Sequence, residues 1–251
     1  MNFWNNFKNK QNLIIAHRGY SAKYPENTLL AFRKAISKCD FIELDIAFSR
    51  DGVAVILHDD TLNRTTNIEE QKGFQEPFYV YDYTLEELKK LDASSWFDTS
   101  LPRQSIPTLK EVLAFAKEQQ IPLNIEIKDL SKTKFNKIGT KKVLDLVEEF
   151  NMQEMVLISS FNHEHIKEAK EINSNIATAA IVEYKHPNNL VEYLKDLDVS
   201  SYHINKNIFS PQIAKELQNK GIFTAVYTVN NKAIKEELFK QGARAIFTDE
   251  L

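Results

Sequence analysis

The sequence predicts an α/β protein: one TIM-type (β/α)₈ barrel over residues 1–251, with a small subdomain inserted between its second strand and second helix. Short apolar, β-branched runs alternate with amphipathic stretches, which is typical of βα units around a parallel sheet. There are eight such runs, and 251 residues is a typical length for one α/β barrel. One connection, 59–107, is too long for a simple βα link, so it predicts the insertion.

The eight apolar runs are the expected barrel strands. They occupy 13–16, 41–46, 123–127, 155–159, 176–182, 201–204, 223–229 and 245–247. Helical patterns between them include 28–37, 109–119, 141–150, 163–171, 211–219 and 232–240. Two of these have start signals, because Thr108 and Glu111 can form a capping box and Pro211 suits a first helical turn.

Two irregularities accompany this pattern. A strand-like run at 53–57 precedes the long connection, which we expect to lie above the barrel. The sequence ends at Leu251, directly after the eighth run, and leaves no residues for an eighth outer helix. The aromatic stretch around Phe3, Trp4 and Phe7 is a candidate to cover that gap.

Charge and cysteine content narrow the function classes. The net charge is −3 and the basic residues are spread along the chain, so neither nucleic acid nor an anionic membrane is an expected partner. The single cysteine, Cys39, is compatible with a reducing compartment. No signal-peptide pattern and no apolar run near the ~18 residues of a spanning helix is present. We therefore expect a cytoplasmic protein without stable membrane insertion; the sequence leaves its oligomeric state open.

Two of the predicted strands carry acidic residues near the barrel end where catalytic groups gather. Glu43 and Asp45 are two positions apart, so they share one face of their strand, and Glu126 lies in the next barrel strand. Such acids need a cation, and three carboxylates suit Mg²⁺ or Ca²⁺ better than zinc. The alternative is a buried ion network with Arg18 and Lys128, but convergence of the acids with two histidines favours a metal site.

The two histidines are His17 and His58. His17 ends the first strand. A two-residue turn at Asp51-Gly52 would place His58 directly opposite Asp45 in a hairpin, whereas a longer turn would shift that pairing. Together with the cationic Arg18, both imidazoles would then lie beside the metal.

This set of residues matches the chemistry of phosphate esters. Cations neutralise charge on the nonbridging oxygens, while two histidines move protons on either side of the phosphorus. A glycine-rich phosphate loop, a serine nucleophile elbow and a zinc-ligand spacing are all absent from the sequence. Phosphate esters are therefore the expected substrates.

The remaining histidines divide into two groups. His163, His165 and His186 lie in helical or loop contexts and are expected to be structural. His203 lies in the sixth barrel strand, so it is either structural or part of the mouth of the barrel.

Several short motifs resemble the signature of glycerophosphodiester phosphodiesterases, in particular the cytosolic bacterial branch. They are His17-Arg18-Gly19, Pro25-Glu26-Asn27-Thr28, Glu43-Leu44-Asp45, Asp51-Gly52, His58-Asp59, Ile106-Pro107-Thr108-Leu109, Glu126-Ile127-Lys128, Ser159-Ser160-Phe161, Tyr227-Thr228-Val229-Asn230 and Thr248-Asp249. The resemblance extends over residues 13 to 249.

The resemblance implies a TIM-type barrel with a small insertion and one divalent cation held by the three acids. It implies that His17 and His58 are the acid–base pair, with His17 as the base and His58 as the acid. It also implies that Arg18 and Lys128 contact the phosphate. Tyr227 stands where many relatives have Trp and is expected to form an aromatic wall for the glycerol.

The implied activity is metal-dependent hydrolysis of glycerophosphodiesters to sn-glycerol 3-phosphate and an alcohol. Two alternatives are open. A lysophospholipase D would use the same barrel and metal but would need room for an acyl chain, whereas the insertion shows no strongly amphipathic membrane helix. A catalytically silent barrel that binds phosphodiesters would lack a metal acid or a histidine, and all of them are present.

Overall fold

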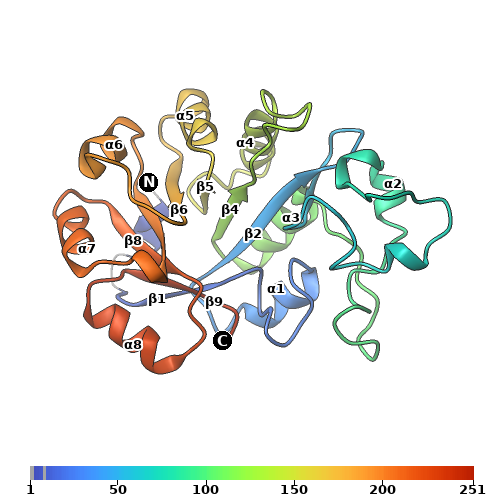
Figure 1. Cartoon of the computed structure of the whole chain (residues 1–251), viewed down its shortest axis with the longest axis horizontal. Helices are drawn as coiled ribbons and strands as arrows, with labels where there is room; N and C mark the ends of the chain where they lie inside the picture. Colours follow the sequence, from blue (N-terminus) through green and yellow to red (C-terminus); the bar gives the residue numbers. More distant parts are fainter. Residues whose placement is uncertain (1–2, 8–9) are drawn as a thin grey trace.

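The computed structural model describes residues 3–7 and 10–251 and has a closed barrel at its centre (Figure 1). Its eight parallel strands close the ring because β1 pairs with both β2 and β9. The barrel strands are β1 (Leu13–Ala16), β2 (Phe41–Phe48), β4 (Leu123–Ile127), β5 (Val156–Ser160), β6 (Ala177–Val182), β7 (Ser201–Asn205), β8 (Phe223–Tyr227) and β9 (Ala245–Thr248). The predicted fold class is confirmed.

Seven helices surround the strands on the outside of the ring (Figure 1). They are α1 (Leu29–Ala35), α3 (Leu109–Gln119), α4 (Gly139–Glu149), α5 (His163–Ile172), α6 (Leu190–Asp196), α7 (Pro211–Gln218) and α8 (Lys232–Lys240). The capping box of Thr108 and Glu111 and the first-turn position of Pro211 are confirmed. Helix α6 fills the gap between β6 and β7, and Asn189 before it makes no capping hydrogen bond through its side chain. No helix of the described residues is long and apolar enough to cross a membrane.

The interior of the barrel changes from apolar to polar along the strands. Its lower part is filled by buried apolar side chains such as Leu13, Ile15 and Phe41. Higher up, at the carboxyl ends, the register pairs Glu43 with Asn124 and Asp45 with Glu126 on the neighbouring strands. Because side chains alternate along a strand, all four of these polar groups share one face of the sheet. They therefore lie together at the end of the barrel that is not filled by apolar side chains.

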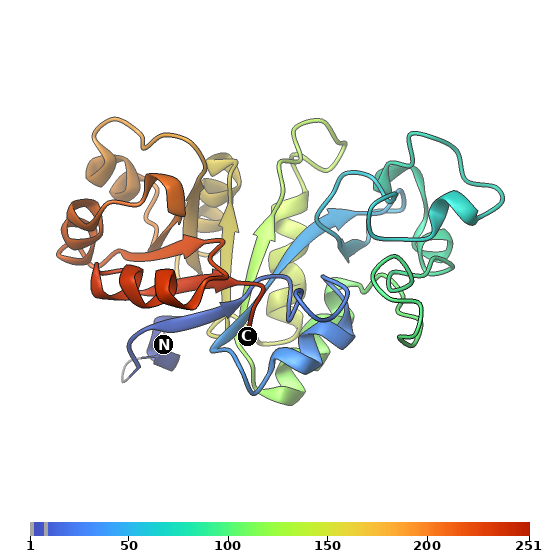
Figure 2. The same ribbon diagram turned by 60° about the horizontal axis from the view of Figure 1, so that its bottom comes forward.

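A short N-terminal helix, η1 (Phe3–Phe7), covers the opposite end of the barrel (Figure 2). The ring of Trp4 lies 4.6 Å from that of Phe223, and its Nε1 donates to Oγ of Ser200 at 2.9 Å. The ring of Phe3 meets Phe41 edge to face. These partners stand at the start of their strands, so the aromatic segment closes the base of the barrel. The idea that it covers the gap left by an eighth helix is wrong, because the apolar interior offers it a better site.

The chain between β2 and α3 extends to one side of the barrel (Figure 1). It contains β3 (Ala54–Ile56), η2 (Ile68–Glu70), η3 (Val80–Asp82) and α2 (Leu85–Leu88). Its apolar residues, including Leu62, Ile68 and Leu88, form a cluster of their own. This packing holds the segment together beside the barrel (Figure 1).

The hairpin between β2 and β3 differs by one residue from the predicted register. Ile46 pairs with Ile56 and Phe48 with Ala54, so Asp45 does not lie directly opposite His58. The turn is longer than two residues because the N–H of Ser49 donates to the carbonyl oxygen of Val53. His58 reaches the barrel mouth because β3 ends at Ile56 and the chain bends at 58–60.

Candidate active site

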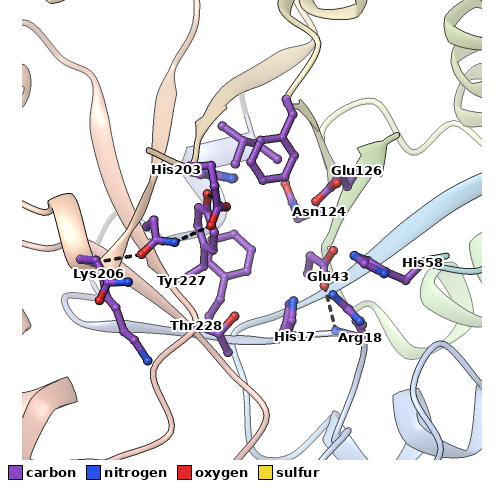
Figure 3. Close-up of a pocket in the computed structure, with 16 residues that line it drawn as sticks. His17, Arg18, Glu43, His58, Asn124, Glu126, His203, Lys206, Tyr227 and Thr228 are labelled. Atoms are coloured by element: carbon purple, nitrogen blue, oxygen red, sulfur yellow. Dashed lines mark hydrogen bonds between the residues drawn. The ribbon is translucent and has the colours of Figure 1, made fainter. Parts of the chain in front are cut away.

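A cavity of about 370 Å³ opens at the carboxyl ends of the barrel strands. One of its sides is formed by residues from β1, β2 and the chain after β3, among them His17, Arg18 and His58 (Figure 3). The other side carries Tyr227 and His203 from β8 and β7 (Figure 3). The cavity thus joins a charged side to an aromatic one.

The three predicted acids meet beside this cavity. One carboxylate oxygen each of Glu43, Asp45 and Glu126 lies within 4.8 Å of the others, and all three side chains are buried. Burial and the neighbouring carboxylates raise the pKa of Glu43 and of Glu126. Burial also acts on Asp45, but the charges of Arg18 and Lys128 outweigh it and lower the pKa of that carboxyl. A divalent cation would remove the repulsion that raises the two glutamate pKa values, so the donor set fits a hard cation.

The cations around the acids test the ion-network alternative. Nζ of Lys128 lies 3.1 Å from Oε1 of Glu126 and 3.8 Å from Oδ1 of Asp45. Arg18 Nε is 3.4 Å from Asp45, but its NH1 donates to Glu26 at 2.9 Å. An ion network is therefore present. It supplies only Lys128 and Arg18 against three carboxylates, and Arg18 is also paired with Glu26, so negative charge remains in excess.

A tight turn after β1 holds one of the acids in place. Arg18 has a φ of 56°, and its backbone N–H donates to Oε2 of Glu43 at 2.8 Å. Gly19 follows with a φ of 84°, and a β-carbon there would lie 2.9 Å from the carbonyl carbon of Ala31. Only glycine suits this position, because the backbone is left-handed and α1 packs against it. The turn therefore fixes both the guanidinium and the Glu43 carboxylate.

His17 is held by the last residues of the barrel. Its Nδ1 lies 2.7 Å from Oδ1 of Asp249, and Ser21 and Asn230 also donate to that carboxylate. Burial opposes ionisation, but these hydrogen bonds and the nearby imidazole lower the pKa of Asp249 to about 2. A carboxylate only accepts, so Nδ1 carries the proton and Nε2 of His17 is left for a substrate.

His58 has a matching arrangement. Its Nδ1 lies 2.6 Å from Oδ1 of Asp59, which also accepts from Nε of Arg64 through its other oxygen. Arg64 in turn donates to both oxygens of Glu26. Burial lowers the pKa of His58, and this effect exceeds the opposite effect of Asp45. Both histidines are therefore oriented by carboxylates, so each can present Nε2 to the cavity.

Sequence reasoning missed these orienting carboxylates. It did not identify Asp249 as the partner of His17 or Asp59 as the partner of His58. It also did not identify Arg64 and Glu26, which support Asp59. The available signal was position: Asp59 is next to a candidate catalytic histidine, and Asp249 directly follows the eighth strand, where catalytic groups gather.

The aromatic side of the cavity surrounds Tyr227. The ring of Tyr227 lies 6.1 Å from that of Phe161 and 6.3 Å from that of Phe247, in edge-to-face arrangements. Its hydroxyl donates to the carbonyl oxygen of Val182 and contacts Glu183 at 2.9 Å. Burial and the Glu183 carboxylate raise the pKa of Tyr227, so the phenol is neutral. The ring thus offers an apolar wall facing the charged side.

The remaining histidines lie in different surroundings. His163 and His186 each have both ring nitrogens within hydrogen-bond distance of a partner and do not line the cavity, which agrees with a structural role. His165 is buried against Thr140 and also stands outside the cavity. His203 is the exception, because it lines the cavity from β7.

Known proteins share this fold and sequence. Residues 17–251 match the Glycerophosphoryl diester phosphodiesterase family. A glycerophosphodiester phosphodiesterase of Caldanaerobacter subterraneus is 35% identical over 242 residues, which are 95% of this chain and 94% of that protein.

Two solved structures agree with this match. A phosphodiesterase of Oleispira antarctica, solved in complex with the product sn-glycerol-3-phosphate, is 31% identical with a TM-score of 0.84 and covers 95% of this chain and 93% of its own. A glycerophosphodiester phosphodiesterase of Thermotoga maritima is 27% identical with a TM-score of 0.74, over 95% of each chain. The chain therefore belongs to the glycerophosphoryl diester phosphodiesterase family, a family of phosphoric diester hydrolases.

Proposed function

We propose that this chain hydrolyses glycerophosphodiesters to sn-glycerol 3-phosphate and an alcohol, with one Mg²⁺ or Ca²⁺ bound by Glu43, Asp45 and Glu126. The observation that carries the proposal is the buried acid cluster beside two histidines, each oriented by a carboxylate. The similar Oleispira protein, which was solved with sn-glycerol-3-phosphate, supports the choice of product.

The two imidazoles would share the proton transfers. His17 takes a proton from the glycerol hydroxyl next to the phosphate, and that oxygen attacks phosphorus. The bond to the leaving alcohol breaks as His58 protonates its oxygen. Water then opens the cyclic phosphate with the proton transfers reversed, which yields the monoester. The lowered pKa of His58 fits a group that readily gives up its proton.

Charge on the phosphate would be balanced from the same side of the cavity. Arg18 and Lys128 carry the nearby positive charges, and we assign them to the nonbridging oxygens. A cation held by the acids would add positive charge there and polarise the phosphate. Tyr227 would form the wall against the glycerol carbons.

The expected partner is a small molecule rather than a nucleic acid, because no clustering of basic residues accompanies the net charge of −3. A cytoplasmic location also belongs to this proposal, since Cys39 has no other cysteine to pair with and is compatible with a reducing compartment.

A turnover assay tests the activity. The metal-replete protein should release glycerol 3-phosphate from glycerophosphoethanolamine or glycerophosphocholine, and a chelator should abolish this release until Mg²⁺ or Ca²⁺ is restored. Glu126→Gln should lose activity, whereas Asp145→Asn, which alters an exposed acid on α4, should keep it. Absence of turnover on every head group would refute the proposal. Faster turnover of lysophosphatidylcholine than of glycerophosphocholine would instead favour a lysophospholipase D.

A further inference from the structure

His203 is a buried imidazole without a hydrogen-bond partner. It is 1% exposed, and neither ring nitrogen finds a donor or acceptor among the described residues. By contrast, His163 and His186 have partners at both nitrogens. Buried polar groups are nearly always paired in folded proteins, so two such atoms on one side chain need an explanation.

A second side chain with an unpartnered atom lines the same cavity. Asn124 is also 1% exposed; its Nδ2 donates to Oγ of Ser159 at 3.0 Å, which fixes the amide, but its Oδ1 has no partner. Both residues line the cavity described above (Figure 3). These two side chains therefore offer three free polar atoms to the cavity.

His203 lies deeper in the barrel than Asn205 and Tyr227, and Asn124 lies level with Glu43. Asn124 is two residues before Glu126 on β4, and His203 is two residues before Asn205 on β7, so each sits one inward-facing position further from the mouth. A ligand group that reaches His203 must extend past Tyr227 into the barrel. The closed base of the barrel limits what can fit there.

The imidazole of His203 is neutral. Its ring packs 4.9 Å from that of Phe247, between its strand neighbours Ile181 and Ala225. Burial lowers the pKa of His203 to about 3. A neutral imidazole carries one N–H donor and one acceptor in either tautomer, and Asn124 adds an acceptor. A hydroxyl, which both donates and accepts, matches this combination.

We propose that His203 and Asn124 form a hydroxyl-reading subsite that binds the terminal hydroxyl of the glycerol moiety. The inference rests on the proposed function and adds the residues that recognise the polyol. The phosphate belongs on the opposite side, beside Arg18, because His203 carries no charge to attract it. The alcohol being released varies in size and belongs at the open mouth, whereas the glycerol is constant and suits a closed site.

Ligand binding by the metal-replete protein tests the subsite directly. Calorimetry would compare sn-glycerol 3-phosphate with its 1-deoxy analogue, a propanediol phosphate of matching configuration that lacks the terminal hydroxyl. The unaltered chain should prefer glycerol 3-phosphate by ~10- to 100-fold, because the analogue leaves buried polar groups unpaired. His203→Phe keeps an aromatic ring against Phe247 and should bind both ligands within ~3-fold of each other.

Two further variants make the result decisive. His203→Gln restores a donor and an acceptor and should recover part of the preference. His186→Phe removes a fully bonded histidine away from the cavity and should keep the full preference. If His203→Phe does not fold, as judged by its circular dichroism, the His203→Gln result decides: a folded variant whose preference is reduced or lost supports the subsite, and one with the full preference of the unaltered chain overturns it.

The outcomes separate this inference from the function on which it rests. If the unaltered chain hydrolyses glycerophosphodiesters but binds both ligands equally, the subsite is refuted and the function stands. The same holds if His203→Phe retains the full preference. If the unaltered chain binds neither ligand and turns over no glycerophosphodiester, the proposed function fails first.

Discussion

Replacing Asp249 by asparagine tests how His17 is oriented. Oδ1 of Asp249 faces His17 and Ser21, and Oδ2 accepts from Nδ2 of Asn230 at 2.8 Å. The amide of Asn230 cannot turn over, because its own Oδ1 accepts the backbone N–H of Asp249 at 2.9 Å. The NH₂ group of the new asparagine must therefore face His17. His17 then has to accept at Nδ1 and carry its proton at Nε2, which is the wrong tautomer for a base.

The size of the effect follows from two contributions. Holding the pKa of Asp249 at about 2 rather than 3.8 corresponds to ~2 kcal/mol of interaction with its partners, which its partial exposure reduces to ~1 kcal/mol. Loss of that charge alone should slow the reaction roughly 5-fold. The wrong tautomer removes general base catalysis, which is worth ~10²- to 10⁴-fold. We expect kcat to fall at least ~100-fold.

Steady-state release of glycerol 3-phosphate in saturating Mg²⁺ would measure kcat and KM. KM should change little, since Asp249 acts through His17 and not on the phosphate. Asp198→Asn is the matched control, because Asp198 is an exposed acid paired with Lys170 at the opposite end of the barrel, and it should keep full activity. If Asp249→Asn is folded and keeps more than about a third of the kcat of the unaltered chain, the orienting role is refuted.

Three further predictions concern stability. Gly19→Ala should destabilise the protein by ~2–4 kcal/mol in urea unfolding, because the new methyl group meets the backbone of Ala31 at a positive φ; a loss below ~1 kcal/mol would contradict this. In the absence of metal, Glu43→Gln should have a Tm no lower than that of the unaltered chain, because the substitution removes a buried charge. Adding Mg²⁺ should raise the Tm of the unaltered chain but not that of the variant, and a rise in the variant would exclude Glu43 as a ligand. The pKa of Asp59 is lowered from 3.8 to about 2, so its charge stabilises the fold above pH 3.8, and this contribution disappears as the pH falls through about 2. In urea unfolding at several pH values, the stability lost in Asp59→Asn should therefore shrink over that range, and a constant difference would be inconsistent with this.

The fold and the acid cluster were predictable because they depend on short-range periodicity. Side chains two positions apart share one face of a strand, so Glu43 and Asp45 had to point together once their strand was recognised. Parallel strands also bring their carboxyl ends to one edge, which placed Glu126 nearby. Neither step required any knowledge of contacts between distant parts of the chain.

The features that were missed depend on contacts with no local signal. The hairpin register differs from the predicted one because the hydroxyl of Ser49 hydrogen-bonds to Asp51 and to the carbonyl oxygen of Val53, which makes the turn longer. Asp249 lies 232 residues from His17 along the chain, so their pairing appears only when the barrel closes. Whether the ring nitrogens of His203 find hydrogen-bond partners also depends on residues that are distant in sequence, so the sequence alone did not decide its role.

The aromatic segment at the base of the barrel links the start of the chain to its end. Trp4 hydrogen-bonds to Ser200, 196 residues later, and packs against Phe223. During synthesis on a ribosome, Trp4 therefore emerges long before Ser200 and Phe223 are made. It can pack against them only when most of the polypeptide has left the ribosome. A fusion partner attached ahead of Phe3 would project from the side opposite the substrate entrance, so tethering the enzyme by that end would leave the entrance accessible.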